Sequence, residues 1–211
     1  MKINEIFKSI QGESTYAGTP CTFIRTAHCN LRCRWCDTAY AFHDGEERTL
    51  DSILDEVRRL GCQCVELTGG EPLLQEEIYP LMTTLVELNY QVLIETSGSL
   101  PIDRVDPRVT IVMDVKCPES GMDQMTCWEN LQWLKPRDEV KFVIANRNDF
   151  EWAESVLSAH ASLKGKAILF SPVFGEMDPS LLAEWILADN LPVRIQLQLH
   201  KYIWDPSLRG V

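Results

Sequence analysis

The sequence has no apolar stretch that could cross a membrane as a helix. Such a helix needs ~20 consecutive apolar residues, and no run in this chain approaches that length. The segment from Met1 to Glu5 carries an acid where a secretion signal would have its basic and apolar regions. These absences predict a protein of the reducing cytoplasm that has no membrane partner.

Basic side chains are in the minority. The chain has 20 lysines and arginines against 31 aspartates and glutamates, which gives a net charge of -11. This balance argues against binding to a nucleic-acid backbone or to an anionic membrane, because both would repel it. We therefore expect a small molecule as the binding partner.

The chain also has no segment that would mark a boundary between domains. No internal repeat, low-complexity run or linker rich in proline, glycine and serine interrupts it. A length of 211 residues with 45% apolar and 24% charged residues suits a globular protein with a sizeable core. We expect a single domain over residues 1–211.

Eight cysteines are present, and three of them form one cluster. Cys29, Cys33 and Cys36 have the spacing C-x3-C-x2-C. In a chain without a secretion signal, clustered cysteines are expected to be metal ligands rather than disulfides. A structural zinc site and an ordinary 4Fe-4S cluster both take four ligands. The three cysteines therefore fit either a cluster with one open iron or a zinc loop that borrows His28 or another distant ligand.

Predicted strands and helices alternate along the chain. The strands are expected at residues 21–26, 64–67, 92–95, 109–115, 140–144, 167–170 and 193–199. The helices are expected at residues 50–60, 78–88, 123–135, 149–160 and 179–189. Alternation means parallel pairing through right-handed crossovers, and a complete eight-unit barrel takes about 250 residues. The sequence predicts an α/β fold, an incomplete TIM-like β/α barrel with about six to seven mainly parallel strands.

Polar residues follow the predicted strands, where functional residues of such barrels gather. They are expected to surround one mouth of the barrel, and they are Arg25 with the cysteines, Thr68, Ser97, Lys116, Ser171 and His200.

A second motif, Gly69-Gly70-Glu71-Pro72, follows the second predicted strand. By itself it could be a plain strand-to-helix turn. Together with the cysteines and Trp35 before the last of them, it resembles the radical S-adenosylmethionine superfamily. The resemblance implies that S-adenosylmethionine fills the open iron with its amino and carboxylate groups, that the glycine motif holds the amino group, and that Trp35 lies against the adenine.

Within this superfamily the whole chain resembles the 7-carboxy-7-deazaguanine synthase family. The resemblance is carried by residues 11–13, 23–25, 36–38, 95–98, 114–118 and 198–201. One departure is Ser14, which stands where the family commonly has glycine. We expect this difference to affect the flexibility of the loop and to leave its contacts in place.

The resemblance implies three groups of site residues. Cys29, Cys33 and Cys36 would hold a 4Fe-4S cluster, and Thr38 would ligate a magnesium ion that also takes the substrate carboxylate, although a loop-capping hydroxyl is the structural alternative. The residues that would contact the substrate are Ile10, Gln11, Gly12, Glu13, Arg25, Thr68 and Pro206. Those that would contact S-adenosylmethionine are Trp35, Cys36, Asp37, Gly70, Ser97, Lys116, Ser171, Pro172, Val173 and Phe174.

The implied activity is that of a carbon-nitrogen lyase in queuosine and deazapurine biosynthesis. A 5'-deoxyadenosyl radical would remove hydrogen from 6-carboxy-5,6,7,8-tetrahydropterin, and the ring would contract to 7-carboxy-7-deazaguanine with loss of ammonia. No side chain is assigned as catalytic, because the cofactor radical carries the chemistry. The resemblance also implies a homodimer and an electron donor such as a flavodoxin or ferredoxin.

Two alternatives follow from the same cysteine spacing. One is an activating enzyme that puts a glycyl radical on a partner protein, which needs a groove for a peptide. The other is a non-catalytic zinc or electron-transfer module, which would have a fourth protein ligand and would not bind S-adenosylmethionine.

Overall fold

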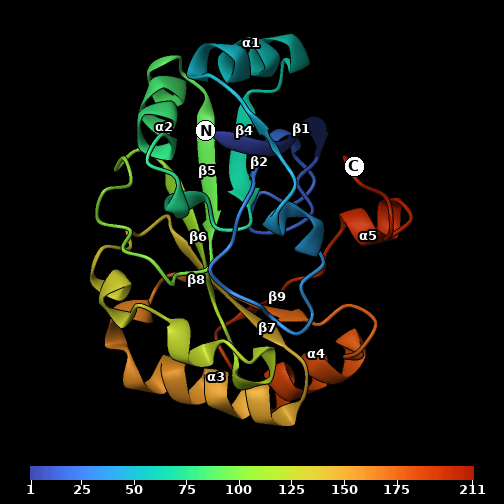
Figure 1. The fold of residues 1–211 in the computed structure, drawn as a ribbon. Helices are drawn as coiled ribbons and strands as arrows, with labels where there is room; N and C mark the ends of the chain where they lie inside the picture. The colour runs from blue at the N-terminus through green and yellow to red at the C-terminus, as the bar shows by residue number, and fades with distance from the viewer.

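The protein is built on one open sheet of nine strands. The computed structural model describes residues 1–211, and its strand order is β3-β1-β2-β4-β5-β6-β7-β8-β9 (Figure 1). The strands are β1 (Lys2–Ile10), β2 (Pro20–Thr26), β3 (Glu46–Glu47), β4 (Cys64–Gly69), β5 (Gln91–Thr96), β6 (Thr110–Val115), β7 (Glu139–Ile144), β8 (Ala167–Pro172) and β9 (Arg194–Ile195).

Parallel pairing runs through most of this sheet. The seven strands from β2 to β9 are parallel to one another, whereas β1 is antiparallel to β2 and β3 is antiparallel to β1. The two edge strands, β3 and β9, do not pair with each other. The predicted incomplete barrel of mainly parallel strands is therefore confirmed, with an antiparallel pair added at its first edge.

Helices cover one face of the curved sheet. They are α1 (Leu50–Leu60), α2 (Ile78–Glu87), α3 (Arg147–Ala159) and α4 (Pro179–Ala188), whereas the short α5 (His200–Ile203) lies apart from them. In Figure 1, α1 and α2 lie beside the first half of the sheet, and α3 and α4 lie beside the second half. No helix is long and apolar enough to span a membrane.

The core lies between the sheet and these helices. A single cluster of 36 buried residues joins strand side chains such as Ile24 and Phe170 to helix side chains such as Val57, Leu85 and Phe150. Each such side chain contributes about 1.5–3 kcal/mol when it is fully buried. Burial of this face leaves the carboxyl ends of the strands free to form a site.

The predicted bounds of α1 are confirmed, and local signals explain them. The Thr49 side chain accepts a hydrogen bond from the backbone of Ser52 at the first turn, and Gly61 ends the helix at φ 69°. A threonine cap and a left-handed glycine are the usual start and stop of a helix.

The predicted helix at residues 123–135 is wrong. The segment forms two short 3-10 turns, Asp123–Met125 and Trp128–Gln132. The Asn130 side chain donates to the carbonyls of Gly98 and Leu100 and accepts from the backbone of Ile102. These bonds tie the segment to the loop after β5 and take the place of a regular helical ladder.

The predicted strand at residues 193–199 is also too long. Only Arg194 and Ile195 pair with β8, after which the backbone of Leu199 donates to the carbonyl of Gly12. His200 therefore begins α5 instead of ending a strand. It still reaches the mouth of the barrel, because the bond to Gly12 brings α5 against the loop after β1.

Candidate active site

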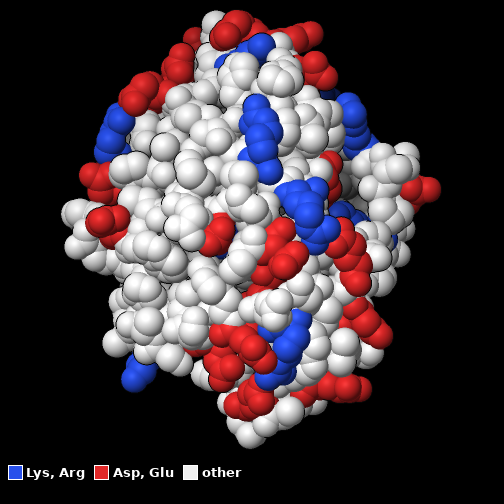
Figure 2. Space-filling view, turned by 60° about the horizontal axis from the view of Figure 1, so that its bottom comes forward, with Lys and Arg blue, Asp and Glu red and all other residues white.

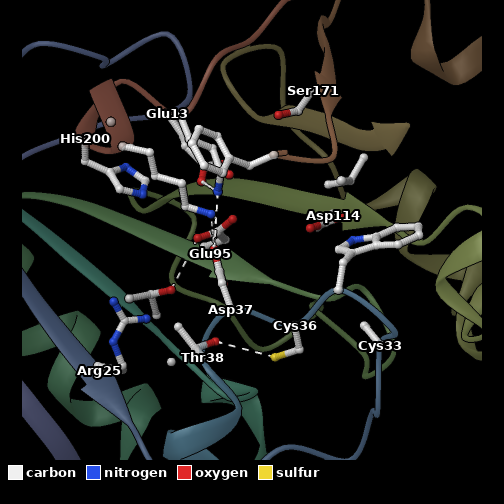
Figure 3. A pocket seen from close by; sticks show the side chains of 18 of the residues that line it. Glu13, Arg25, Cys33, Cys36, Asp37, Thr38, Glu95, Asp114, Ser171 and His200 are labelled. Atoms are coloured by element: carbon white, nitrogen blue, oxygen red, sulfur yellow. Dashed lines mark hydrogen bonds and ion pairs between the residues drawn. The ribbon is translucent and has the colours of Figure 1, made fainter. Parts of the chain in front are cut away.

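A pocket of about 730 Å³ opens at the carboxyl ends of the parallel strands (Figure 3). Residues from β1, β2, β4, β5, β6, β7 and β8 line it, together with the loops that follow these strands. The structure brings all of the predicted site residues to this one pocket. They are Ile10, Gln11, Gly12, Glu13, Arg25, Cys29, Cys33, Trp35, Cys36, Asp37, Thr38, Thr68, Gly70, Ser97, Lys116, Ser171, Pro172, Val173, Phe174 and Pro206.

The cysteine loop, residues 29–36, forms one wall. Its three thiols are free and half-buried, and Cys36 Sγ lies 3.7 Å from Thr38 Oγ1. His28 does not line the pocket; its Nδ1 lies 3.1 Å from the carbonyl oxygen of Phe42. The histidine that a zinc loop would borrow is thus turned away from the thiols.

The glycine turn, residues 69–72, packs directly against the cysteine loop. A Cβ atom on Gly70 would lie 1.9 Å from the carbonyl oxygen of His28, and one on Gly69 would lie 2.3 Å from that of Thr26. Gly69 also has φ 131°, which L side chains rarely adopt. Both glycines are therefore required by the close approach of these two segments.

The buried side chain of Glu71 holds the glycine turn in place. Its fully buried carboxylate accepts hydrogen bonds from the backbone of Leu73 and from the Thr96 hydroxyl on one oxygen. The other oxygen accepts from the backbone and hydroxyl of Ser97, both within 2.8 Å. Glu71 thus joins the turn after β4 to the turn after β5, and its oxygens point into the protein.

Arg25 lies near the end of β2, where it pairs with Thr68 of β4. Its Nε donates to Glu5 at 2.7 Å, and Tyr40 donates to the same carboxylate oxygen at 2.9 Å. The two terminal nitrogens of Arg25 have no hydrogen-bond partner within the protein. They are thus free to bind an anion in the pocket, which is the geometry that a carboxylate needs.

The inner wall of the pocket is rich in carboxylates. We use the name acidic wall for Glu13, Glu66, Glu95 and Asp114, all of which line the pocket. Lys141 of β7 bonds to Glu13 at 2.8 Å and to Glu95, and it lies 3.6 Å from Asp114.

Two members of the acidic wall have opposite pKa shifts. Burial alone would raise the pKa of Glu13, but Lys141 and a hydrogen bond from Gln198 outweigh it and lower the pKa to about 2. Burial raises the pKa of Glu66 well above its usual value, and repulsion by Glu95 and Glu13 adds to the effect. The acidic wall therefore holds one carboxyl whose ionised form is favoured, Glu13, and one whose protonated form is favoured, Glu66.

The C-terminal part of the chain closes the pocket on the side of β1. The ring of His200 packs on Gly12, where a Cβ atom would lie 2.0 Å from the His200 Nδ1, and burial lowers the pKa of His200. Gln198 donates to Glu13 at 2.9 Å, and Lys201 lies 2.7 Å from Asp37.

A model of the radical S-adenosylmethionine superfamily matches residues 23–108 of this chain. The 7-carboxy-7-deazaguanine synthase of Chlorobaculum tepidum is 50% identical over 100% of this chain and 97% of its own length. The chain belongs to the 7-carboxy-7-deazaguanine synthase family. The synthase of Koribacter versatilis is 46% identical, with 100% of both chains covered.

Solved structures agree with membership of the 7-carboxy-7-deazaguanine synthase family. QueE from Escherichia coli superposes with a TM-score of 0.80 at 25% identity, with 94% of each chain covered. SuiB from Streptococcus suis, with a TM-score of 0.63 at 13% identity over 89% of this chain and 52% of SuiB, shares the fold alone. Full-length identity to named synthases favours this family over the activating enzyme and the zinc module.

Membership of the radical S-adenosylmethionine superfamily implies a 4Fe-4S cluster and S-adenosylmethionine as cofactors. The residues of the pocket fit both groups. No group of three or more His, Cys, Asp or Glu side chains surrounds a single-ion position. A four-iron cluster instead spreads its thiolate ligands around a cube. Three free thiols on one wall, next to a glycine turn that brings backbone to the pocket, match that requirement.

The sequence analysis assigned no role to several residues that line the pocket. Tyr40, Glu66, Glu95, Asp114 and Lys141 all line it. Lys141 carried a usable signal, because it is a charged residue in a predicted parallel strand, and such strands are usually buried on both faces. Tyr40 carried none, since it lies in a short 3-10 turn, Ala39–Phe42, and is held by contacts with Glu5 and Arg209, which are distant in sequence.

Proposed function

We propose that this protein converts 6-carboxy-5,6,7,8-tetrahydropterin to 7-carboxy-7-deazaguanine with loss of ammonia, as a carbon-nitrogen lyase of queuosine and deazapurine biosynthesis. The observation that carries the proposal is the pocket itself. The cysteine loop and the glycine turn line it together with Gln11, Glu13 and Arg25. Relatives that carry the name of this synthase match over the whole chain.

The cofactors would lie along the cysteine loop and the glycine turn. Cys29, Cys33 and Cys36 would hold the cluster. S-adenosylmethionine would contact Trp35, Cys36, Asp37, Gly70, Ser97, Lys116 and residues 171–174. When bound, these two groups supply the one-electron chemistry that starts the reaction.

The chain's own residues would bind and orient the pterin. Arg25 offers two free guanidinium nitrogens to its carboxylate, and Thr38 would add a hard oxygen ligand for a magnesium ion bound to that same carboxylate. Ile10, Gln11, Gly12, Glu13, Thr68 and Pro206 would enclose the ring. Holding the reacting carbon in one position and keeping water out are the contributions that a protein makes in such chemistry.

The proposal also includes an electron donor, a cellular location and an oligomeric state. An acidic electron donor such as a flavodoxin or ferredoxin is supported by Arg32 and Arg34, which are exposed within the cysteine loop. The reducing cytoplasm is proposed because three free thiols are needed. A single domain over residues 1–211 and a homodimer complete the proposal.

The test is anaerobic reconstitution with iron and sulfide, reduction, and addition of S-adenosylmethionine, magnesium and 6-carboxytetrahydropterin. We expect 7-carboxy-7-deazaguanine by mass spectrometry, and we expect it to vanish in Cys33→Ala but not in Cys127→Ala, whose thiol lies outside the pocket. An arm without magnesium tests the Thr38 site. Formation of 5'-deoxyadenosine with the pterin untouched would contradict the substrate, and failure to bind a cluster would contradict the enzyme.

A further inference from the structure

A charged side chain lies in the middle of β7, where the sheet is buried. Val140, Phe142 and Ile144 of this strand point into the core beneath the helices. Lys141 points to the other face, into the pocket, with only 6% of its side chain exposed. A buried ammonium is costly unless it is paired and hydrogen-bonded, so its partners indicate what it does.

Lys141 is shared by carboxylates from three different segments. Its Nζ lies 2.8 Å from Glu13 Oε2, in the loop after β1, and it bonds to Glu95 Oε1 on β5. It lies 3.6 Å from Asp114 Oδ2 on β6, which is paired with Lys116 at 2.9 Å. One cation therefore joins an acid of the loop after β1 to acids of two central strands, β5 and β6.

These contacts continue on both sides of Lys141. Glu13 Oε1 accepts from Gln198 at 2.9 Å, and Glu95 Oε2 accepts from Thr68 at 3.3 Å. Glu13 and Glu95 would otherwise lie side by side as two negative charges. Adjacent carboxylates disfavour each other's ionised form, and a cation between them offsets this repulsion.

The pocket is consequently polarised. Figure 3 shows Glu13, Glu95 and Asp114 apart from Arg25 and Thr38, with Asp37 between the two groups. A pterin has the same polarity, with a carboxylate at one end and a pyrimidine ring bearing N–H and NH₂ donors at the other. An ionised carboxylate accepts hydrogen bonds from such donors, whereas a protonated one presents a donor to them.

We propose that Lys141 is a positioning residue that keeps Glu13 and Glu95 ionised together, so that both accept hydrogen bonds from the donor-rich ring of the pterin. The inference rests on the proposed function, because it takes the pterin as the ligand of the pocket. It assigns the orientation of the ligand, with the ring toward Lys141 and the carboxylate toward Arg25.

Binding of 6-carboxypterin to the cofactor-free protein tests this directly by calorimetry. Lys141→Met is expected to weaken binding at neutral pH by about 30-fold or more, because a buried charge loses its partner. Lys141→Arg, which keeps the charge, is expected to lose less. Lys164→Met, an exposed lysine remote from the pocket, is the matched control and should bind as the parent protein does.

The pH dependence separates this role from a merely structural one. The charged and titratable groups around Lys141 are Glu13, Glu66, Glu95, Asp114, Lys116 and His200. In Lys141→Met, binding should recover as pH rises from 6 to 9 and the protonated acid ionises, while the parent protein should bind evenly over this range. In the reconstituted enzyme the same variant should raise KM for the pterin more than it lowers kcat.

Equal affinity and equal pH profiles for Lys141→Met and the parent protein would overturn the inference. If Lys141→Met does not fold, the double variant Glu95→Gln/Lys141→Met removes the charge pair together. That variant should bind weakly without any pH dependence, and a retained dependence would count against Lys141. A parent protein that neither binds 6-carboxypterin nor converts the pterin would overturn the proposed function, and this inference with it.

Discussion

Glu66 on β4 lines the pocket next to the Gln11 side chain. It is 4% exposed and takes a hydrogen bond from the Gln11 amide, and burial raises its pKa well above the usual 4.5. The folded protein therefore binds a proton that the unfolded chain releases above about pH 4.5. Stability is expected to fall as pH rises from that value toward the folded-state pKa.

The substitution Glu66→Gln tests whether stability falls as pH rises. The amide keeps the bond to Gln11 and cannot ionise, so the variant should be more stable than the parent by about 1–3 kcal/mol at pH 8. The gain should shrink toward pH 5. Urea denaturation at the two pH values measures it, with exposed Glu87→Gln as the control. An equal difference at both values would show that Glu66 is ionised in the folded state.

At the scale of elements, the site depends on bonds between the loops that follow neighbouring strands. Glu71 accepts four hydrogen bonds, two on each oxygen, from residues after β4 and after β5. Glu71→Gln places an NH₂ group against N–H and O–H donors whichever way the amide turns. A buried mismatch of this kind costs about 1–3 kcal/mol.

We expect the melting temperature of Glu71→Gln to fall by about 2–12 °C for a chain of this size. Glu87→Gln, an isosteric change on the exposed face of α2, should lie within about ±0.5 kcal/mol of the parent. Calorimetric melting of both variants gives the comparison. A melting temperature unchanged in Glu71→Gln would mean that the two loops are held together by other contacts.

The elements also show what could be predicted from the sequence. Periodic apolar patterns predicted β2 and β4 to β8, as well as α1 to α4, because a strand or helix that buries one face must repeat at its own period. The segments at 123–135 and 193–199 were misjudged, since Asn130 and Leu199 bond to distant loops and override local preference. Ser14 has φ 62°, so the conformation that a glycine favours is present here without the glycine.

The site was predictable where its residues follow strands or form spaced motifs. The cysteine loop and the glycine turn are contiguous, and parallel strands place their ends at one mouth. Lys141, Glu95 and Glu66 were not predicted, since their role depends on which strands become neighbours. Asp114 and Lys141 face each other only because β6 pairs with β7 in that register.

At the scale of the whole molecule, the C-terminal segment and the first strand, β1, both line the pocket. Figure 1 shows the C-terminal segment beside the N-terminal strands, and a Cβ atom on Gly210 would lie 3.9 Å from Phe7 Cβ. Pro206 to Val211 all line the pocket. Figure 2 shows acidic side chains scattered over the face turned forward, with lysines and arginines in small groups among them. This distribution accords with the net charge of -11.

The segment from Ser207 to Val211 covers the wall that contains Arg25 and Tyr40, and the Arg209 guanidinium lies 3.8 Å from the Tyr40 ring centre. Removing these five residues should leave the sheet intact, because they belong to no helix or strand. It should raise KM for the pterin about tenfold or more by opening the pocket to water, and increase the 5'-deoxyadenosine formed per product.

The variant Arg209→Ala removes only the cation–π contact and should raise KM for the pterin by about two- to fivefold. Steady-state kinetics with both products measured would decide, and an unchanged KM in the truncated protein would show that the pocket closes without this segment.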